Sequence, residues 1–297
     1  MRKIIADFNG VFVSSEFAKT IRWYLAACYF SKKYPEINDN FIESIIKGRK
    51  EGFEEIYQKI LNNKFHKANI KYSFRFIGDS RGDFAKAMAQ KFWKKRISSE
   101  ELSGIIRLGL KLNNSLMNWF SKPIFENINF FQKFQMKAKY FYKEEGSIGI
   151  ITMTTTKAFL ETIHRGKNFW GDYTQFMQKF LSIDRKGGLK FVECGGDHPE
   201  ILTKSKVDKK IKVYKSLLKK MNIKANETVA FEDTPAGCIA ARKCGLYTIG
   251  CTDGKFIEDN HFCSIQIIGG LKKLEKYVDL FIVYCPKDLI AFLKEVI

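Results

Sequence analysis

Apolar and polar positions follow two different patterns along this chain. Short apolar runs that end in polar or turn residues are typical of buried strands. They occur at residues 3–6, 147–152, 189–194, 228–231, 247–250 and 280–283. Between and after the later runs, apolar residues three and four positions apart predict helices over 157–163, 207–221, 236–244 and 286–296. Strands that alternate with helices indicate an α/β fold with a Rossmann-like parallel sheet, covered on both faces.

The second pattern occupies residues 16–146. Apolar residues here follow helical spacing almost throughout, most clearly over 17–30, 40–46, 53–61, 83–93 and 100–112. Strand signals are few in this stretch. We therefore expect residues 16–146 to form a large helical domain, inserted after the first strand of an α/β core made of residues 1–15 and 147–297.

Composition narrows the class of protein further. With 45% hydrophobic and 28% charged residues, the 297-residue chain can bury a sizeable core and is not a disordered polymer. The apolar runs are too short to cross a bilayer, and Asp7 stands where a signal peptide needs an apolar stretch. The seven cysteines are an odd number without a C-x-x-C pair, which disfavours a zinc site or a disulfide framework. We expect buried thiols in a cytoplasmic protein that has no membrane partner.

The net charge of +19 would attract phosphates, nucleic acids or other anionic surfaces. The basic residues are nevertheless scattered, with Asp and Glu between them. This distribution favours a solvated basic surface, which would bind nucleic acid only weakly and without sequence preference.

Polar clusters that could carry chemistry stand at strand ends or helix starts, at residues 7–11, 152–154, 204–206 and 232–237. In a parallel sheet such positions converge on one edge. Asp7 together with the pair Glu232 and Asp233 would form a hard-cation site suited to Mg²⁺. A hydroxyl and a lysine at helix N-termini would bind phosphate. A carboxylate beside a metal and a phosphate can act as a nucleophile.

Two of these clusters carry a family resemblance. Residues 7–11 read DFNGV and lead to Ser15-Glu16, and residues 232–241 read EDTPAGCIAA, followed by Cys244-Gly245. These motifs resemble D-x-D-G-V and E-D-[ST]-P-A-G-x-x-A-A of the haloacid dehalogenase-like phosphotransferase superfamily, particularly its β-phosphoglucomutase-like branch. The resemblance covers residues 1–16 and 147–297; the insertion matches only in its position and its helical character.

The resemblance implies a role for each matching residue. Asp7 would be the nucleophile and a metal ligand, and Asn9 would offer its backbone carbonyl to the metal. Thr152 would bind the transferring phosphoryl group, with backbone donors from Met153 and Thr154 nearby. Mg²⁺ would be the cofactor, and a phosphorylated small molecule the substrate.

The remaining roles fall on a lysine and an acidic pair. Lys206 would neutralise charge on the nucleophile and the phosphate, although its spacing to Glu232 is about a helical turn longer than expected. Lys204 and Lys209 are alternatives for this role. Asp233, with Glu232 through a water molecule, would complete the metal site.

One departure from the motif concerns the reaction itself. The second aspartate of D-x-D-G-V, which would protonate the leaving group, is Asn9 in this chain. An amide cannot donate and recover a proton at neutral pH, and general acid–base catalysis is typically worth about 10²–10⁴-fold. A phosphatase for leaving groups that need no proton, and a catalytically weak or inactive relative, both fit this change.

The resemblance also implies that the helical insertion is a cap, which closes over the site and selects the substrate. Lys47 and Arg49 stand where such caps place substrate-facing residues, although a solvated loop between helices would look the same. His164 and His198 show no partner pattern and are interpreted as structural or surface residues.

The sequence therefore predicts a Mg²⁺-dependent phosphatase that acts through an aspartyl-phosphate on Asp7. The alternative is an inactive relative that binds an anionic partner through its basic cap. Processing of nucleic-acid ends would rest only on charge and cap aromatics, because no known nucleic-acid-binding module is visible.

Overall fold

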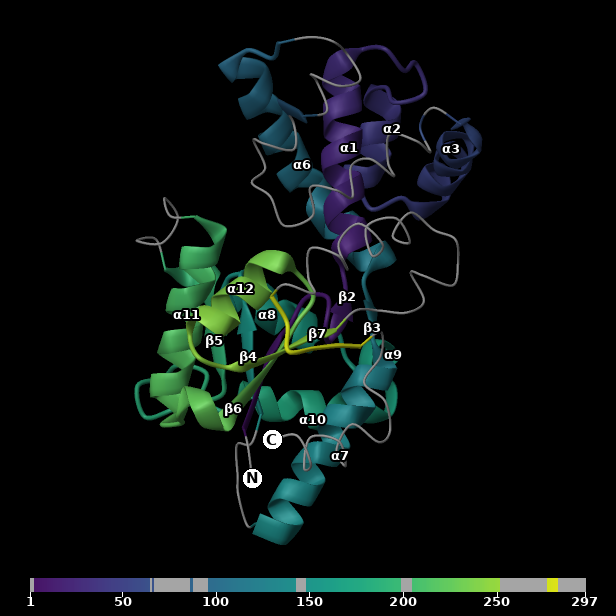
Figure 1. The fold of residues 1–297 in the computed structure, drawn as a ribbon. Coiled ribbons are helices and arrows are strands. Elements are labelled where there is room, and N and C mark those ends of the chain that lie inside the picture. The colour runs from purple at the N-terminus through teal and green to yellow at the C-terminus, as the bar shows by residue number, and fades with distance from the viewer. Residues whose placement is uncertain are drawn as a thin grey trace. The chain divides into compact units, whose positions relative to one another are not determined.

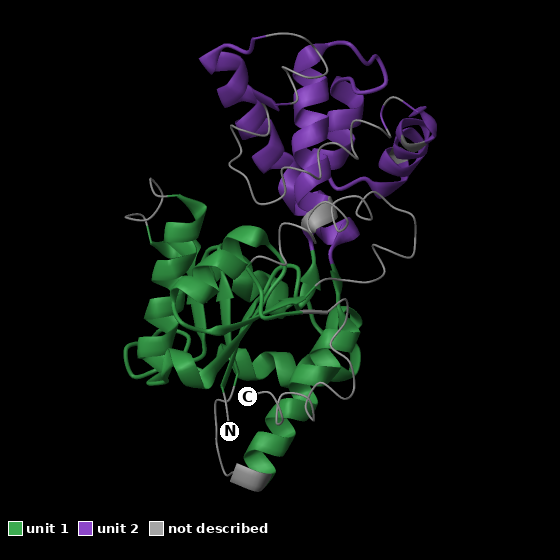
Figure 2. Ribbon diagram, viewed as in Figure 1, with its two compact units in different colours: residues 1–14, 122–255, 269–297 green, residues 15–121, 256–268 purple. Residues whose placement is uncertain are grey.

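The computed structural model describes residues 3–64, 66, 86–87, 96–142, 148–198, 205–251 and 277–282. The chain divides into two compact units (Figure 2). Residues 1–14, 122–255 and 269–297 belong to unit 1, and residues 15–121 and 256–268 to unit 2. Unit 1 is an α/β unit, and the described part of unit 2 is helical.

A six-stranded sheet forms the centre of unit 1 (Figure 1). Its strands are β1 (Lys3–Asp7), β4 (Ile148–Thr152), β5 (Val192–Cys194), β6 (Thr228–Glu232), β7 (Tyr247–Cys251) and β8 (Leu280–Ile282). They lie in the order β5-β4-β1-β6-β7-β8, and every neighbouring pair is parallel. The predicted α/β fold with a parallel sheet is confirmed, and each of these strands overlaps a predicted apolar run.

Helices cover both faces of this sheet, as the alternation of side chains along β1 requires. Ile4 and Ala6 belong to one apolar cluster and Ile5 to another. The first cluster includes side chains of the four helices α7 (Phe125–Tyr142), α8 (Thr156–Ile163), α9 (Lys167–Trp170) and α10 (Thr174–Gln178). On the other face, the cluster around Ile5 includes side chains of α11 (Lys206–Met221) and α12 (Pro235–Lys243). Short 3₁₀ turns lie at Gly171–Tyr173, Lys179–Leu181, Gly195–Asp197 and Ala225–Glu227.

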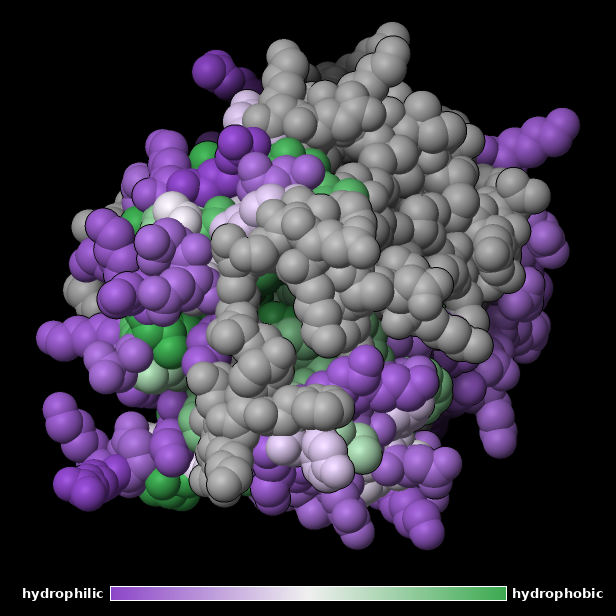
Figure 3. Space-filling view, turned by 60° about the horizontal axis from the view of Figure 1, so that its bottom comes forward, coloured by the Kyte–Doolittle hydropathy of each residue, from purple (hydrophilic) through white to green (hydrophobic). Residues whose placement is uncertain are grey.

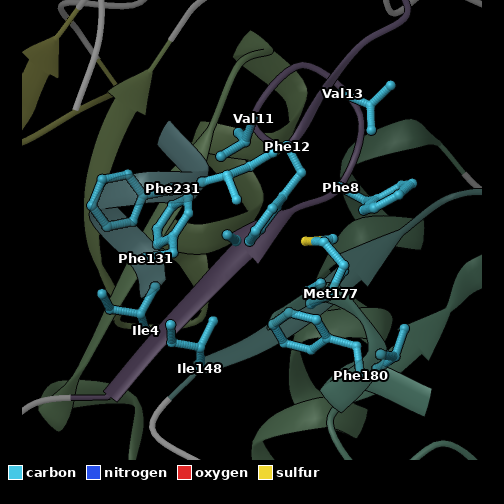
Figure 4. Packing of buried hydrophobic residues seen from close by; sticks show 14 of the residues in the cluster. Ile4, Phe8, Val11, Phe12, Val13, Phe131, Ile148, Met177, Phe180 and Phe231 are labelled. Atoms are coloured by element: carbon cyan, nitrogen blue, oxygen red, sulfur yellow. The ribbon is translucent and has the colours of Figure 1, made fainter. Parts of the chain in front are cut away.

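The helix α7 belongs to the α/β unit, which corrects the predicted boundary at residue 146. Its Phe131 packs beside Ile4 and Phe231 in the core of unit 1 (Figure 4). The rings of Phe131 and Phe231 meet edge to face, with centroids 5.1 Å apart. The first and longer segment of the helical unit therefore ends at Ser121.

A small antiparallel ladder lies where the chain leaves and re-enters unit 1. Strand β2 (Val13–Ser14) pairs with β3 (Lys122–Pro123). Strands of two residues each are too short to show a periodic pattern, and the apolar pattern predicts neither of them.

The helical unit has its own core. Its described helices are α1 (Glu16–Ser31), α2 (Asp39–Ile46), α3 (Lys50–Asn62) and α6 (Ser99–Phe120). Apolar side chains from all four form one cluster, which includes Tyr24, Phe41, Phe53 and Leu116. The predicted helix over 83–93 lies largely outside the described residues, and the one over 286–296 lies entirely outside them.

Across the described residues, no helix combines the length and apolar character needed to span a bilayer. The described residues on the face shown in Figure 3 are mostly hydrophilic. The five described cysteines form no disulfide with one another, and Cys28, Cys194, Cys238 and Cys251 are buried. Cys263 and Cys285 lie outside the described residues.

Candidate active site

The sheet places two acidic residues side by side at its carboxyl edge. Asp7 ends β1 and Glu232 ends β6, and these parallel strands pair with Ala6 opposite Phe231. Asp7 has the same side-chain parity as Ile5, so both acidic side chains lie on the face that α11 covers. From β1 the sheet continues to β4 on one side and to β6 on the other, which makes this edge a topological switch point, where α/β sheets bind ligands.

A lysine from α11 joins these two acids. Lys210 Nζ lies 2.5 Å from Asp7 Oδ2 and donates to both oxygens of Glu232 at 2.9 and 2.7 Å. Tyr214, one turn further along α11, donates its hydroxyl to Glu232 Oε1 at 2.9 Å. The side chains of Asp7, Glu232 and Lys210 are at most 7% exposed. The three charged groups are therefore held together out of water.

The lysine at the site is not one of those that the sequence analysis named. Lys206 is the first residue of α11, and Lys210 lies one helical turn further on. Lys209 is half-buried and makes none of the hydrogen bonds to Asp7 or Glu232 described above, and Lys204 lies outside the described residues. The additional turn accounts for the long predicted spacing between Lys206 and Glu232.

A signal for Lys210 is present in the sequence. It precedes Val213, Tyr214 and Leu217 by three, four and seven positions, so it lies on the apolar stripe of α11. A lysine on a buried stripe needs a charged partner, because an unpaired buried ammonium is very costly. That requirement distinguishes Lys210 from the solvated lysines around it.

The charges at the site leave an excess of negative charge. Asp7, Glu232 and Asp233 each offer one oxygen, and these oxygens lie within 4.8 Å of one another. Three carboxyl groups share one ammonium group, that of Lys210, so the acidic groups outnumber the basic one. Oxygen ligands and this charge fit a hard divalent cation such as Mg²⁺.

The same charges govern the titration of these groups. Burial raises the pKa of the Glu232 carboxyl to about 7; the Lys210 ammonium opposes this rise, and the Asp7 carboxylate adds to it. Burial alone would lower the pKa of Lys210, but Asp7 and Glu232 raise it above the usual value. The lysine therefore stays charged at any physiological pH.

Two glycines make room for the carboxylates. Gly10 has φ +88°, and a Cβ at this position would lie 1.7 Å from Asp233 Oδ2. A Cβ at Gly237 would lie 1.9 Å from Glu232 Oε2. The amide of Gly237 also donates to the hydroxyl of Thr234, which caps α12 at 3.2 Å. The glycines of both motifs are therefore required by the positions of the acidic side chains.

A group of hydroxyl and amide side chains lies at the ends of β1 and β4. The Asn9 side-chain amide donates to Thr152 Oγ1 at 3.1 Å. Thr152 Oγ1 lies 3.1 Å from Thr154 Oγ1 and accepts from the Thr154 amide at 3.3 Å. Both Asn9 and Thr152 are buried. Met153 is half-buried, and its side chain packs against the apolar cluster around Ile5.

The predicted substrate contacts of the insertion lie in unit 2. Lys47 follows α2, and its ammonium lies 2.5 Å from Glu43 Oε1, with both side chains at least half exposed. Arg49 precedes α3. Their contact with a substrate stays a prediction.

The two histidines that the sequence points out, His164 and His198, each take part in the local structure of unit 1. His164 caps the C-terminus of α8. His198 Nε2 lies 2.8 Å from Glu193 Oε1.

The sequence and the structure were compared with those of known proteins. No protein-family model and no curated protein matches the sequence. Among solved structures, a putative β-phosphoglucomutase from Thermotoga maritima is similar over 100% of both chains, with 15% identity and a TM-score of 0.51. A HAD family hydrolase from Deinococcus radiodurans R1, solved with bound phosphate and sodium, covers 99% of this chain and 96% of its own, with 13% identity and a TM-score of 0.54.

A predicted phosphoglycolate phosphatase from Haemophilus somnus 129PT gives a TM-score of 0.50 at 13% identity, over 91% of this chain and 98% of its own. The chain therefore has the haloacid dehalogenase-like fold, which confirms the resemblance at the level of the fold.

Proposed function

We propose that this chain is a Mg²⁺-dependent phosphatase or phosphotransferase that forms an aspartyl-phosphate on Asp7 and acts on a phosphorylated small metabolite in the cytoplasm. The observation that carries the proposal is the contact of Lys210 with both Asp7 and Glu232, beside the three convergent carboxylates at the carboxyl edge of the sheet. A buried nucleophile with a fixed positive charge next to it suits attack on an anionic phosphate.

The metal would be held by Asp7, Glu232 and Asp233, together with the backbone carbonyl of Asn9. When bound, Mg²⁺ supplies positive charge that offsets the charge on the phosphoryl oxygens. The excess of carboxylates over ammonium groups at the site supports this assignment.

The chain's own residues account for the transfer. An Asp7 carboxylate oxygen attacks phosphorus and forms a P–O bond, while the bond to the leaving oxygen breaks and its electron pair departs with that oxygen. The Lys210 ammonium, which contacts Asp7 Oδ2, would offset negative charge on Asp7 and on the incoming phosphate. The hydroxyls of Thr152 and Thr154 would donate to the phosphoryl oxygens. Attack of water on phosphorus then releases phosphate and restores the Asp7 carboxylate.

Asn9 sets the class of leaving group. Its amide has no proton to give to a departing alkoxide, and its nitrogen already donates to Thr152 Oγ1. Esters and anhydrides whose leaving groups depart as stable anions should therefore react faster than sugar phosphates. Lys47 and Arg49 in the insertion would contribute to substrate selection.

The test is a phosphatase screen with and without Mg²⁺ against a broad panel of phosphate esters and anhydrides. We expect Mg²⁺-dependent turnover of activated phosphates, abolished in Asp7→Asn and retained in Lys59→Ala, which changes an exposed lysine of α3 that pairs with Glu55. Equal activity of wild type and Asp7→Asn would show that contaminating phosphatases account for the signal, and would count against the proposal.

A second candidate function rests on Asn9 and on the basic residues of the insertion. The chain would then be a catalytically weak or inactive relative that binds an anionic partner through the basic surface of its cap. In that case Asp7→Asn would leave binding of a polyanion such as heparin unchanged, and charge reversals in the insertion would weaken it. Nucleic acid would bind weakly and lose affinity steeply as salt rises.

A further inference from the structure

Two loops meet behind the candidate phosphate-binding hydroxyls. Residues 152–156 run from the end of β4 to the start of α8, and the turn Gly195–Asp197 follows β5, the neighbouring parallel strand. The amide of Gly196 donates to the carbonyl of Thr154 at 3.0 Å. A Cβ at Gly196 would lie 2.6 Å from Thr154 C and from Thr155 N. The two backbones therefore touch at a distance that only glycine permits.

The next residue of the turn holds the other end of the loop. Both carboxylate oxygens of Asp197 accept from the amide of Thr156, at 3.1 and 2.9 Å. Thr156 is the first residue of α8, and Thr155 caps this helix through the amide of Ala158 at 3.3 Å. Asp197 is exposed, so its placement does not follow from burial in the core. The hydrogen bonds from the Thr156 amide therefore hold the Asp197 carboxylate against the loop.

The turn is itself anchored on α11. His198, which follows the turn, contacts the buried carboxylate of Glu193 at 2.8 Å. The same carboxylate accepts from Ser216 Oγ at 2.8 Å and lies 2.5 Å from Lys220 Nζ, both on α11. Since α11 also carries Lys210, one helix supports both the charged centre and the turn that holds residues 152–156.

We infer that Asp197 and Gly196 are positioning residues, which hold the Thr152 and Thr154 hydroxyls for phosphate without touching it themselves. The inference rests on the proposed function, because it assigns phosphate to those hydroxyls. Asp197 fixes the loop at Thr156, Gly196 fixes it at Thr154, and the Thr154 amide and hydroxyl both contact Thr152 Oγ1. Loosening the turn should weaken binding of phosphate and leave binding of Mg²⁺ intact, since the metal-binding carboxylates lie on β1 and β6 or directly after it.

The experiment compares Asp197→Ala with a matched control, Asp184→Ala. Asp184 is another carboxylate of unit 1 that accepts two backbone amides, from Lys186 at 2.8 Å and Gly188 at 3.0 Å, in a turn outside the site. Inorganic phosphate is titrated calorimetrically into the full chain in the presence of Mg²⁺. Mg²⁺-dependent shifts in melting temperature and hydrogen exchange of residues 152–156 are measured on the same samples.

We expect Asp197→Ala to raise the Kd of phosphate about tenfold, the effect of losing one charge-assisted hydrogen bond. Exchange over 152–156 should be faster, and the Mg²⁺-dependent shift unchanged. Asp197→Asn keeps one acceptor oxygen and should fall between wild type and Asp197→Ala. Asp184→Ala should bind phosphate as wild type does.

Three results would overturn the inference. Wild-type phosphate affinity in Asp197→Ala shows that the turn does not position the hydroxyls. Parallel loss of phosphate binding and of the Mg²⁺ shift in this variant shows only general destabilisation. If the wild type binds Mg²⁺ but no phosphate, the hydroxyls of Thr152 and Thr154 do not bind phosphate and there is nothing for the turn to position. Failure of the proposed function is distinguishable, because the wild type would then show neither a Mg²⁺ shift nor turnover of any phosphate compound.

Discussion

The ammonium group of Lys210 lies 2.5 Å from the carboxylate of Asp7, although 203 positions separate the two residues along the chain. Both side chains are almost fully buried. Removing one member of such a pair leaves an uncompensated charge in a water-poor site, so each residue depends on the other.

Lys210→Met should lower the free energy of unfolding by about 3–5 kcal/mol at neutral pH, because Asp7 and Glu232 lose their shared counter-charge. It should also abolish phosphatase activity. Urea denaturation and an activated ester measure the two effects. Lys206→Met, one helical turn away, is the control and should change both far less. Loss of activity in Lys206→Met but not in Lys210→Met would assign the charge-neutralising role to Lys206 instead.

Mg²⁺ should raise the melting temperature of the wild type, because a ligand that binds only the folded state stabilises that state by mass action. At a Mg²⁺ concentration of one hundred times the Kd, the stabilisation is about 2.7 kcal/mol. Asp233→Asn removes one carboxylate and should abolish most of the shift. Differential scanning fluorimetry over a millimolar Mg²⁺ series measures it. A wild type that shows no shift in this range would rule out the proposed metal site.

Asn9→Asp should restore a proton donor next to Thr152. Turnover of sugar phosphates should then rise roughly tenfold or more, within the usual range for general acid catalysis. Hydrolysis of p-nitrophenyl phosphate should rise less, because its leaving group needs no proton. Steady-state kinetics on both substrates measure the difference, with Asp7→Asn/Asn9→Asp as the inactive control. Equal gains on both substrates would mean that Asn9 affects folding or the metal instead.

Gly10→Ala should lose Mg²⁺ binding as well as stability. The new methyl group would lie 1.7 Å from Asp233 Oδ2, and the backbone keeps φ at +88°. Gly187→Ala is a matched control, because φ is +80° there and a Cβ would meet nothing within 4 Å. Both variants should lose about 1–2 kcal/mol to backbone strain, and only Gly10→Ala should lose the Mg²⁺-dependent shift. An unchanged shift in Gly10→Ala would show that Asp233 does not need its present position.

The stability that Glu193 provides should depend on pH. Burial raises its pKa, but hydrogen bonds from Lys220, Ser216 and His198 outweigh burial and hold the pKa below 4.5. A carboxyl whose pKa is lowered by folding stabilises the protein fully above its unfolded pKa, and loses that effect as pH falls through the folded value. The difference in unfolding free energy between wild type and Glu193→Gln should therefore be largest near pH 7 and shrink below about pH 4.5. Urea titrations at both ends of this range measure it; a difference that grows on acidification would contradict the assignment.

The strands follow from the sequence because each is a short apolar run, and the convergence on one edge follows because β1, β4 and β6 end at polar motifs. The placement of Asp7 and Glu232 side by side then needs only the parity of side chains along two parallel strands. The end of the insertion could not be predicted in this way. Helix α7 has the same apolar period as the helices before it, and only its packing against Ile4 and Phe231 assigns it to unit 1.

Lys210 was missed for a different reason. Lysines are so frequent in this chain that spacing alone favours the helix start at Lys206, and only the apolar stripe of α11 distinguishes Lys210. The turn at Gly196 and Asp197 was also missed, because a backbone contact between two loops leaves no periodic signal in either of them.

The central position of β1 has a consequence for biosynthesis. Its partners are β4 and β6, so Ala6 pairs with residues that leave the ribosome long after it, Phe231 last of all. At about 20 residues per second, roughly ten seconds pass before β6 follows β1. During that time the apolar segment from Ile4 to Ala6 has no strand beside it on the β6 side. The nascent chain should therefore be a substrate for chaperones that shield apolar segments, and the candidate site can form only after β6 has been synthesised.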